Sequence, residues 1–219
     1  MKNRISIVLA AMLFNSVGLK AQVQVSKEPR HKNVLENKYI RLLDVWIPPG
    51  DTTLFHIHST PSVFVHFTNT VVCSQIKGKA WETSKNTEGN ASYRSFVNDI
   101  LVHRVSNCDT VPFHVTDIEL LSPYNPTKKS KALPFPLLYE NERVFAYQLT
   151  DSSFKNIQLN NRGPLIAEVV TGEVKYADVT KRTSAIIKTG KCLYIEPGKI
   201  FSFVAAGKEK SLMILFEIK

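Results

Sequence analysis

The chain has 219 residues and a formal net charge of +9, and its glycine, proline and aromatic contents are ordinary for a globular protein. Its lysines and arginines are spread along the sequence, and the one tight cluster, residues 128–131, lies in a proline-rich stretch. No basic helix or interleaved aromatic platform accompanies that cluster, so we expect no nucleic-acid partner.

The first 21 residues have the pattern of a secretory signal peptide. Lys2 and Arg4 precede the apolar run "ISIVLAAMLF", which is too short to span a bilayer, and Ala21 stands at a suitable cleavage position. A buried N-terminal helix is the alternative interpretation. No later stretch is apolar enough for a membrane span, so we expect a soluble protein in a secreted or periplasmic location. Residues 22–34 are predicted to form a polar leader in which His31 is exposed.

Strand patterns dominate the rest of the chain. Short segments rich in Val, Ile, Phe and Thr alternate with Gly, Pro, Asn and Asp turns, as in "YIRLLDVWIP", "SVFVHFTNTVV", "VPFHVTDIELL", "LIAEVVTGEV" and "LMILFEI". No segment after the signal has a sustained 3.6-residue period. The pattern predicts an all-β protein, either a sandwich or a barrel.

Two pairs of segments indicate an internal duplication. "ENKYIRLLDV" at Glu36 resembles "ENERVFAYQL" at Glu140, and "PSVFVHFTN" at Pro61 resembles "PLIAEVVTG" at Pro164, with offsets of 104 and 103 residues. The Pro/Lys-rich stretch 121–138 lies between the two copies and is predicted to be a linker. The sequence therefore predicts two β-domains, residues 35–120 and 139–219.

The three cysteines, Cys73, Cys108 and Cys192, do not make a disulfide framework. In an oxidising compartment one pair could form a bridge, and Cys73–Cys108 is the first to test because both lie in the same half. The alternative is three buried thiols that act as small apolar side chains.

Three of the six histidines lie between residues 48 and 70, in "PPGDTTLFHIHSTPSVFVHFTNT". Side chains at i and i+2 of a strand point to the same face, so His56 and His58 present two imidazoles side by side. Imidazole is a ligand for Fe, Zn, Cu, Ni and Mn, and His103, on a distant strand, is a third candidate ligand. A metal-free barrel with histidines in a pocket is the alternative.

These segments resemble the motifs of the cupin superfamily. "GDTTLFHIH" fits G-x5-H-x-H at the start of the first cupin motif, and "HRVSN" fits the H-x3-N that ends the second. The resemblance implies two tandem jelly-roll barrels, a bicupin, in which His56, His58 and His103 share one divalent metal. The first motif normally carries a Glu ligand four or five residues after its second His, where this chain has Ser62 and Val63. The three-His set that remains resembles that of some cupin-like thiol dioxygenases.

Strand alternation from Ser62 places Phe64 and His66 inside the same barrel, so we expect these three residues to line a pocket, with His66 deeper than the ligands. A satisfied core histidine is the alternative for His66. In the second copy, alignment puts Leu159 and Asn161 at the positions of His56 and His58, and Phe201 at that of His103. We therefore expect no metal in the C-terminal barrel, which would support the fold, close a pseudo-dimer within the chain or hold an apolar ligand.

The sequence thus predicts a secreted metal-binding cupin that binds or acts on a small organic or sugar-derived molecule. Three neutral imidazoles around a divalent ion leave a charge of about +2, which favours an anionic co-ligand. The alternative is a non-catalytic small-molecule-binding or scaffold protein on a cupin barrel without metal. A homodimer is compatible with either function. The sequence names neither the catalytic residues nor the reaction.

Overall fold

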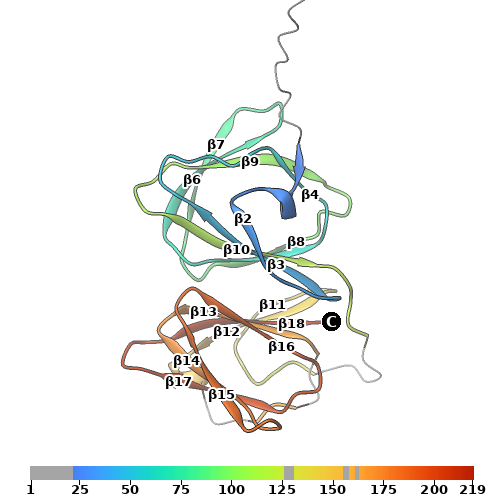
Figure 1. Cartoon of the computed structure of the whole chain (residues 1–219), viewed down its shortest axis with the longest axis vertical. Coiled ribbons are helices and arrows are strands. Elements are labelled where there is room, and N and C mark those ends of the chain that lie inside the picture. Colours follow the sequence, from blue (N-terminus) through green and yellow to red (C-terminus); the bar gives the residue numbers. More distant parts are fainter. Residues whose placement is uncertain (1–21, 126–130, 155–157, 161–162) are drawn as a thin grey trace, which may run out of the picture.

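The computed structural model describes residues 22–125, 131–154, 158–160 and 163–219, which form two β-barrels stacked along the long axis of the molecule (Figure 1). The N-terminal barrel contains β1 (Val23–Gln24), β2 (His31–Glu36), β3 (Ile40–Ile47), β4 (His56–His58), β5 (Ser62–His66), β6 (Thr70–Ile76), β7 (Trp81–Asn86), β8 (Ala91–Arg94), β9 (Leu101–Asn107) and β10 (Phe113–Leu120). The C-terminal barrel contains β11 (Leu137–Glu140), β12 (Val144–Thr150), β13 (Leu165–Thr171), β14 (Glu173–Asp178), β15 (Thr183–Lys188), β16 (Lys191–Ile195), β17 (Phe201–Ala206) and β18 (Leu212–Ile218). The only helices among the described residues are two 3-10 turns, η1 (Val25–Lys27) and η2 (Asp151–Ser153).

The two barrels share one topology, which confirms the predicted duplication. One sheet of the N-terminal barrel has the order β2-β3-β10-β5-β8, and one sheet of the C-terminal barrel has the order β11-β12-β18-β13-β16. Strand β12 begins 104 residues after β3, and β13 begins 103 residues after β5, as the sequence offsets require. The remaining sheets have the orders β1-β4-β9-β6-β7 and β15-β14-β17.

Strands β3, β12 and β18 carry apolar side chains on both faces, because each face packs into its own core. On β3, Leu43 and Val45 point into the N-terminal barrel, whereas Ile40 and Leu42 point towards the other barrel. The same alternation on β12 and β18 fills the C-terminal barrel with one set of side chains and presents the other set to the first barrel. Burial on both sides explains why these strands read as nearly continuous apolar runs.

One hydrophobic core joins the two barrels. Its buried members come from both barrels: Ile40, Leu42, Val63, Val65, Phe67, Ile118, Leu120, Val144, Ala146, Ile166, Val170, Ile214, Phe216 and Ile218. The sequence left open whether the barrels pack within one chain or between two chains. In this structure they pack within the chain through this shared core.

The segment predicted to be a polar leader is part of the N-terminal barrel. Strand β1 pairs in parallel with β4, and β2 pairs with β3 in an antiparallel ladder. Val25 of η1 is buried in the barrel core together with Leu43 and Val45. The predicted signal peptide and residues 126–130 of the predicted linker lie outside the described residues. No helix among the described residues has the length and hydropathy needed to cross a bilayer.

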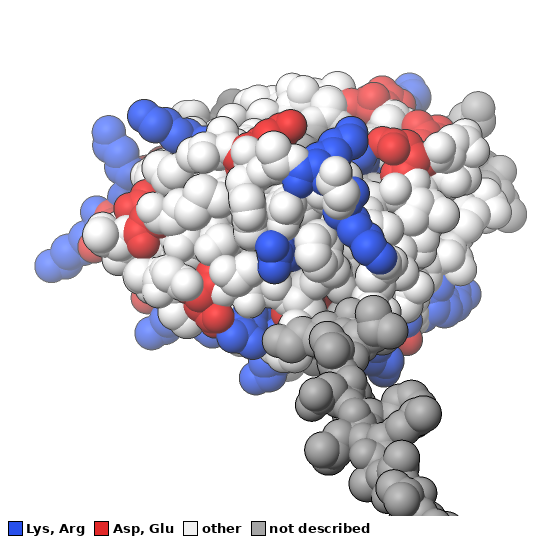
Figure 2. Space-filling view, turned by 90° about the horizontal axis from the view of Figure 1, so that it is seen from above, with Lys and Arg blue, Asp and Glu red and all other residues white. Residues whose placement is uncertain are grey.

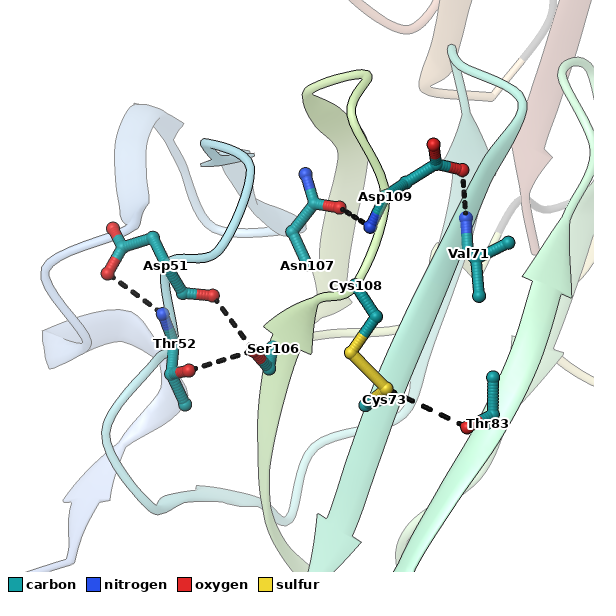
Figure 3. The surroundings of a disulfide bond; sticks show 9 residues. All are labelled: Asp51, Thr52, Val71, Cys73, Thr83, Ser106, Asn107, Cys108 and Asp109. Carbon is teal, nitrogen blue, oxygen red and sulfur yellow. Dashed lines mark hydrogen bonds between the residues drawn. A yellow bond between two sulfur atoms is a disulfide. The ribbon is translucent and has the colours of Figure 1, made fainter.

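Cys73 and Cys108 form a disulfide that ties β6 to the end of β9 (Figure 3). Their Cα atoms are 5.9 Å apart, and 35 residues separate them in sequence. The Cys192 thiol is free, and burial raises its pKa to about 12. Beside the bridge, Ser106 of β9 accepts a hydrogen bond from the Thr52 hydroxyl at 2.9 Å, which fastens the loop before β4 to the same strand.

Replacing both bridge cysteines with serine should lower the free energy of unfolding by about 2–4 kcal/mol, because a loop of this length is constrained in the unfolded chain. Chemical denaturation of the wild type and of the Cys73→Ser/Cys108→Ser variant measures the difference. A reductant should lower the wild-type midpoint and leave the variant's midpoint unchanged. Equal midpoints for reduced and oxidised wild type would contradict the prediction.

Candidate metal centre

Strands β4 and β9 bring three histidines together inside the N-terminal barrel. The two strands are antiparallel neighbours, and their register places His56 directly opposite His103. His58 lies two residues after His56 and points to the same face, so its ring joins the pair. His56 and His58 are buried, with exposed fractions of 1% and 4%.

The spacing of the three rings fits a single metal ion. One ring nitrogen from each histidine lies within 4.8 Å of the others, and the Nε2 atoms of His58 and His103 are 3.1 Å apart. Ring centres are 5.0 Å apart for His56–His58, 4.6 Å for His56–His103 and 5.0 Å for His58–His103. Two nitrogens that each lie about 2.1 Å from one ion are roughly 3.0–3.4 Å apart at coordination angles of about 90–110°. The His58–His103 pair therefore has the spacing of two ligands of one ion, and a ring nitrogen of His56 lies within 4.8 Å of both.

The other nitrogen of each ring faces a different partner. The Nδ1 atom of His56 lies 2.9 Å from the Leu54 carbonyl oxygen, and Nδ1 of His103 lies 3.2 Å from the Ser74 hydroxyl. Nδ1 of His58 lies 3.4 Å from a carboxyl oxygen of Asp117. Metal-binding histidines usually have their second nitrogen held by a hydrogen bond, because the partner fixes both the tautomer and the ring orientation. His56 and His103 fit this pattern, whereas Nδ1 of His58 lies near Asp117 without a hydrogen bond to it. For His56 and His103 this leaves Nε2 for a metal, and Nε2 of His58 faces that of His103.

Burial keeps the three rings neutral. Burial, with a smaller contribution from His31, lowers the pKa of His56 to about 4. Burial and the neighbouring His56 lower the pKa of His103 to about 3, and burial lowers the pKa of His58 still further. Only the neutral imidazole binds a metal, so all three side chains have the required protonation state at neutral pH.

A cavity of about 130 Å³ adjoins the three rings inside the barrel. Phe64 and His66, both expected in the pocket, line it, and burial lowers the pKa of His66 to about 4. Ser62 is fully buried, but its hydroxyl donates to the Thr60 carbonyl oxygen, and it does not line the cavity. The full lining consists of His31, Val45, Ile47, His56, His58, Phe64, His66, His103, Val105, Phe113, Val115 and Asp117.

Asp117 is a site residue that the sequence reasoning missed. It lies at an inward-facing position of β10, two residues after Val115, and burial followed by the nearby Glu119 raises its pKa to about 8. A signal was available in the sequence, because Asp117 follows the apolar residues Phe113 and Val115 on the same face of the strand, and a carboxylate on a buried face is unusual. Asp117 gives the centre a buried carboxyl group at a place different from that of the missing cupin Glu.

Phe96 packs against the ring of His58. Its ring stacks on His58 with centroids 5.0 Å apart, and Arg94 lies over the Phe96 ring at 4.9 Å. Phe96 has a φ of 55°, a left-handed conformation that is rare for an aromatic residue. Strained backbone of this kind persists where the surrounding structure holds it, and here it is held beside the candidate centre.

The prediction that His31 is exposed is wrong. Only 8% of its surface is accessible, and it lines the cavity. The polar residues around His31 suggested a solvated leader. Instead, η1 is followed by β2, which begins at His31, and the His31 side chain lines the cavity inside the barrel. Its ring centre is 4.7 Å from that of His56 and 6.5 Å from that of His58.

The C-terminal barrel has apolar residues at the equivalent positions. Leu159 forms an isolated antiparallel bridge with Phe201, as His56 pairs with His103 in the first barrel. Both Leu159 and Phe201 are buried in the core of the second barrel. Asn161, aligned with His58, lies outside the described residues. The pairing of His56 with His103 is thus repeated in the second barrel by two apolar residues.

Comparison with known proteins supports the fold. No family model matches the sequence, and no curated protein is similar to it in sequence. Among solved structures, the cupin 2 conserved barrel domain protein from Leptotrichia buccalis superposes with a TM-score of 0.54 over 89% of this chain and 90% of that one, at 15% identity. The chain has the cupin fold. It carries two copies of that fold in tandem, an arrangement called a bicupin.

Two enzymes are similar to the bicupin in fold. A variant of the salicylate 1,2-dioxygenase from Pseudoaminobacter salicylatoxidans gives a TM-score of 0.56 at 10% identity, over 82% of this chain and 71% of that one. The oxalate decarboxylase from Lactobacillus farciminis gives 0.54 at 10% identity, over 83% and 77%. The two names describe different reactions, so at this identity the likeness extends to the fold alone.

Proposed function

We propose that the bicupin binds one divalent metal, drawn from Fe, Zn, Mn, Ni and Cu, through His56, His58 and His103, and that it binds or acts on a small organic molecule at that metal. The observation that carries the proposal is the convergence of three neutral imidazoles whose second nitrogens each face another partner. When bound, the metal would act as a Lewis acid towards an oxygen of that molecule.

The surrounding residues give the ligand its size and character. The cavity is mostly apolar and its volume of about 130 Å³ suits a short carbon skeleton. An anionic or oxygen-bearing head would balance the net positive charge of a metal held by three neutral rings. Asp117 holds a proton near the centre because burial raises its pKa to about 8.

We also propose a secreted or periplasmic location. The signal-like sequence of the first 21 residues supports it, and so does the Cys73–Cys108 disulfide, because such bridges persist mainly in oxidising compartments.

Seen from the end of the N-terminal barrel, positive and negative side chains are interspersed over a largely uncharged surface (Figure 2). A face without a concentrated positive patch fits a small-molecule ligand better than a polyanion, which binds to clustered positive charge.

Elemental analysis tests the metal site. Residues 22–219 should hold close to one equivalent of metal per chain after reconstitution with each candidate ion. The His56→Ala/His58→Ala variant should hold less than about a tenth of that amount, because a single remaining imidazole binds weakly. His66→Ala, which removes a cavity histidine outside the triad, is the matched control and should retain the metal.

Two results would contradict the proposal. The first is a wild type that takes up no transition metal at a stoichiometric level. That result would favour the alternative, a metal-free binding or scaffold protein. The presence of Ser62 where a cupin has its Glu ligand supports this alternative. The double variant could retain the metal, which would show that other residues are the ligands.

A further inference from the structure

A second pocket, of about 310 Å³, lies in the N-terminal barrel beside the candidate metal centre. Residues of β7 and of β8, the edge strands of the two sheets of this barrel, both line it. The His103 side chain lines this pocket as well as the 130 Å³ cavity. The pocket is therefore at an edge of the barrel, next to one of the proposed ligands.

The strand register shows that one wall of the pocket is the inner face of a sheet. Residues that pair directly across neighbouring strands lie on the same face. Ile76 of β6 pairs with His103, so the two side chains share the inner face of the barrel. Ser74 lies two residues before Ile76 and pairs with Glu82 of β7, which places both on that face as well.

Arg94 comes from the inner face of the opposite sheet. It pairs with Ser62 of β5, two residues before Phe64, which lines the 130 Å³ cavity. The guanidinium lies over the Phe96 ring at 4.9 Å, and that ring stacks on His58. One phenyl ring thus separates the Arg94 guanidinium from a proposed ligand.

The lining carries two cations, Arg94 and Lys79, and one carboxylate, Glu82. Lys79 lies in the turn after β6, where its backbone N–H donates to the Ile76 carbonyl oxygen at 2.9 Å. Neither Lys79 nor Glu82 forms an ion pair with another described residue. Arg94 donates to Asp99 at 2.6 Å, but these side chains are 43% and 78% exposed, and an exposed pair contributes little. Both cations are therefore available to a ligand.

We propose that this pocket binds the carboxylate of a small organic acid through the Arg94 guanidinium and the Lys79 ammonium. The planar donors of a guanidinium match the two oxygens of a carboxylate. Ile76 and Leu101 supply an apolar surface for the carbon chain of the acid. Glu82 reduces the net charge of the lining to +1, which suits a carboxylate better than a polyphosphate. The inference goes beyond the proposed function and does not require the metal.

Methyl NMR of the metal-free chain, residues 22–219, tests the inference with succinate and succinamide as probes. The two molecules have the same carbon skeleton, and only succinate carries carboxylates. Succinate should shift the methyl signals of Ile76 and Leu101, which line the pocket, and leave those of Ile186 on β15 unchanged. Succinamide should bind at least about tenfold more weakly, because it lacks the charge that strengthens these hydrogen bonds.

Substitution of the two cations should weaken the binding of succinate by different amounts. Arg94→Gln should raise the dissociation constant about 5- to 20-fold, the effect of one charged, hydrogen-bonded contact. Lys79→Gln, which removes an exposed charge, should raise it about 2- to 5-fold. Lys85→Gln is the control and should change it less than about twofold, because Lys85 lies three residues after Glu82, on the other face of β7.

Two results would overturn the inference. One is a set of methyl shifts that leaves out Ile76 and Leu101, and the other is an equal affinity of Arg94→Gln and wild type for succinate. If Arg94→Gln does not fold, Arg94→Lys keeps the charge without the planar donors, and unchanged affinity in both Arg94→Lys and Lys79→Gln would overturn the inference. Because these titrations contain no metal, their outcome is independent of whether the three histidines bind one.

Discussion

Replacing Glu168 with glutamine should make the bicupin more stable at alkaline pH and leave its stability at pH 5 almost unchanged. Glu168 lies on β13 at the junction of the two barrels, opposite Cys192 of β16, and none of its surface is accessible. Neither carboxylate oxygen has a hydrogen-bond partner among the described residues. Burial raises the pKa of Glu168 from 4.5 to about 8, and the nearby Thr116 side chain lowers it by less than burial raises it.

The sign of the effect follows from proton linkage. Between about pH 4.5 and pH 8 the folded protein keeps the Glu168 proton while the unfolded chain releases it, so stability falls as the pH rises through this window. A shift of this size corresponds to roughly 3–5 kcal/mol. The neutral amide of Glu168→Gln removes this loss.

Urea unfolding of wild type and Glu168→Gln at pH 5, 7 and 9 measures the difference. We expect the variant's advantage to grow with pH and to level off above about pH 8. Glu209→Gln, which removes a carboxylate from the exposed part of the same barrel, controls for the change in net charge. An advantage of the same size at pH 5 and pH 9 would show that Glu168 does not keep its proton in the folded state.

Truncating one isoleucine in the shared core should unfold both barrels together. Ile214 lies on β18, the central strand of the C-terminal sheet, is fully buried and faces the N-terminal barrel. Ile214→Ala should lower the free energy of unfolding by about 2–5 kcal/mol, because it removes buried methyl groups and leaves a cavity. Ile118→Ala, on the central strand β10 of the other barrel, should have a similar effect.

The tryptophans allow the cooperativity to be measured. Both of them, Trp46 and Trp81, belong to the N-terminal barrel. In Ile214→Ala the midpoint from tryptophan fluorescence should fall as far as the midpoint from circular dichroism. Ile186→Ala, at a partly exposed position of β15 in the same barrel as Ile214, is the control and should cost less than about 1 kcal/mol. An unchanged fluorescence midpoint in Ile214→Ala would show that the barrels unfold independently.

Much of the fold could be predicted from the sequence because its strands are strongly patterned. Turn residues mark the strand ends, and the repeated segments at Glu36 and Glu140 fix the correspondence between the copies. The i, i+2 spacing of His56 and His58 fixes their common face whatever their distant neighbours are. Placing His103 opposite His56 needed the motif resemblance, since register between distant strands is set by the packing of the whole barrel.

The residues that escaped prediction are those placed by tertiary contacts. His31 lies among polar residues in the sequence. Its burial depends on η1 and on a hydrogen bond to Glu28, which the pattern of neighbouring residues does not reveal. Glu168 is a carboxylate in the middle of an apolar strand, and only the docking of the two barrels removes it from water. Phe96 reaches His58 from a loop, where strand alternation gives no guidance.

The core shared by the two barrels also affects how the protein behaves on dilution. A single barrel with the face of Ile40, Leu42 and Ile118 uncovered would need a second molecule to shield it, and its folded fraction would then depend on concentration. Here the partner is carried on the same polypeptide, so the shielding is independent of how many molecules are nearby. The second copy could therefore exchange its ligand positions for Leu159 and Phe201 and still keep the first copy folded.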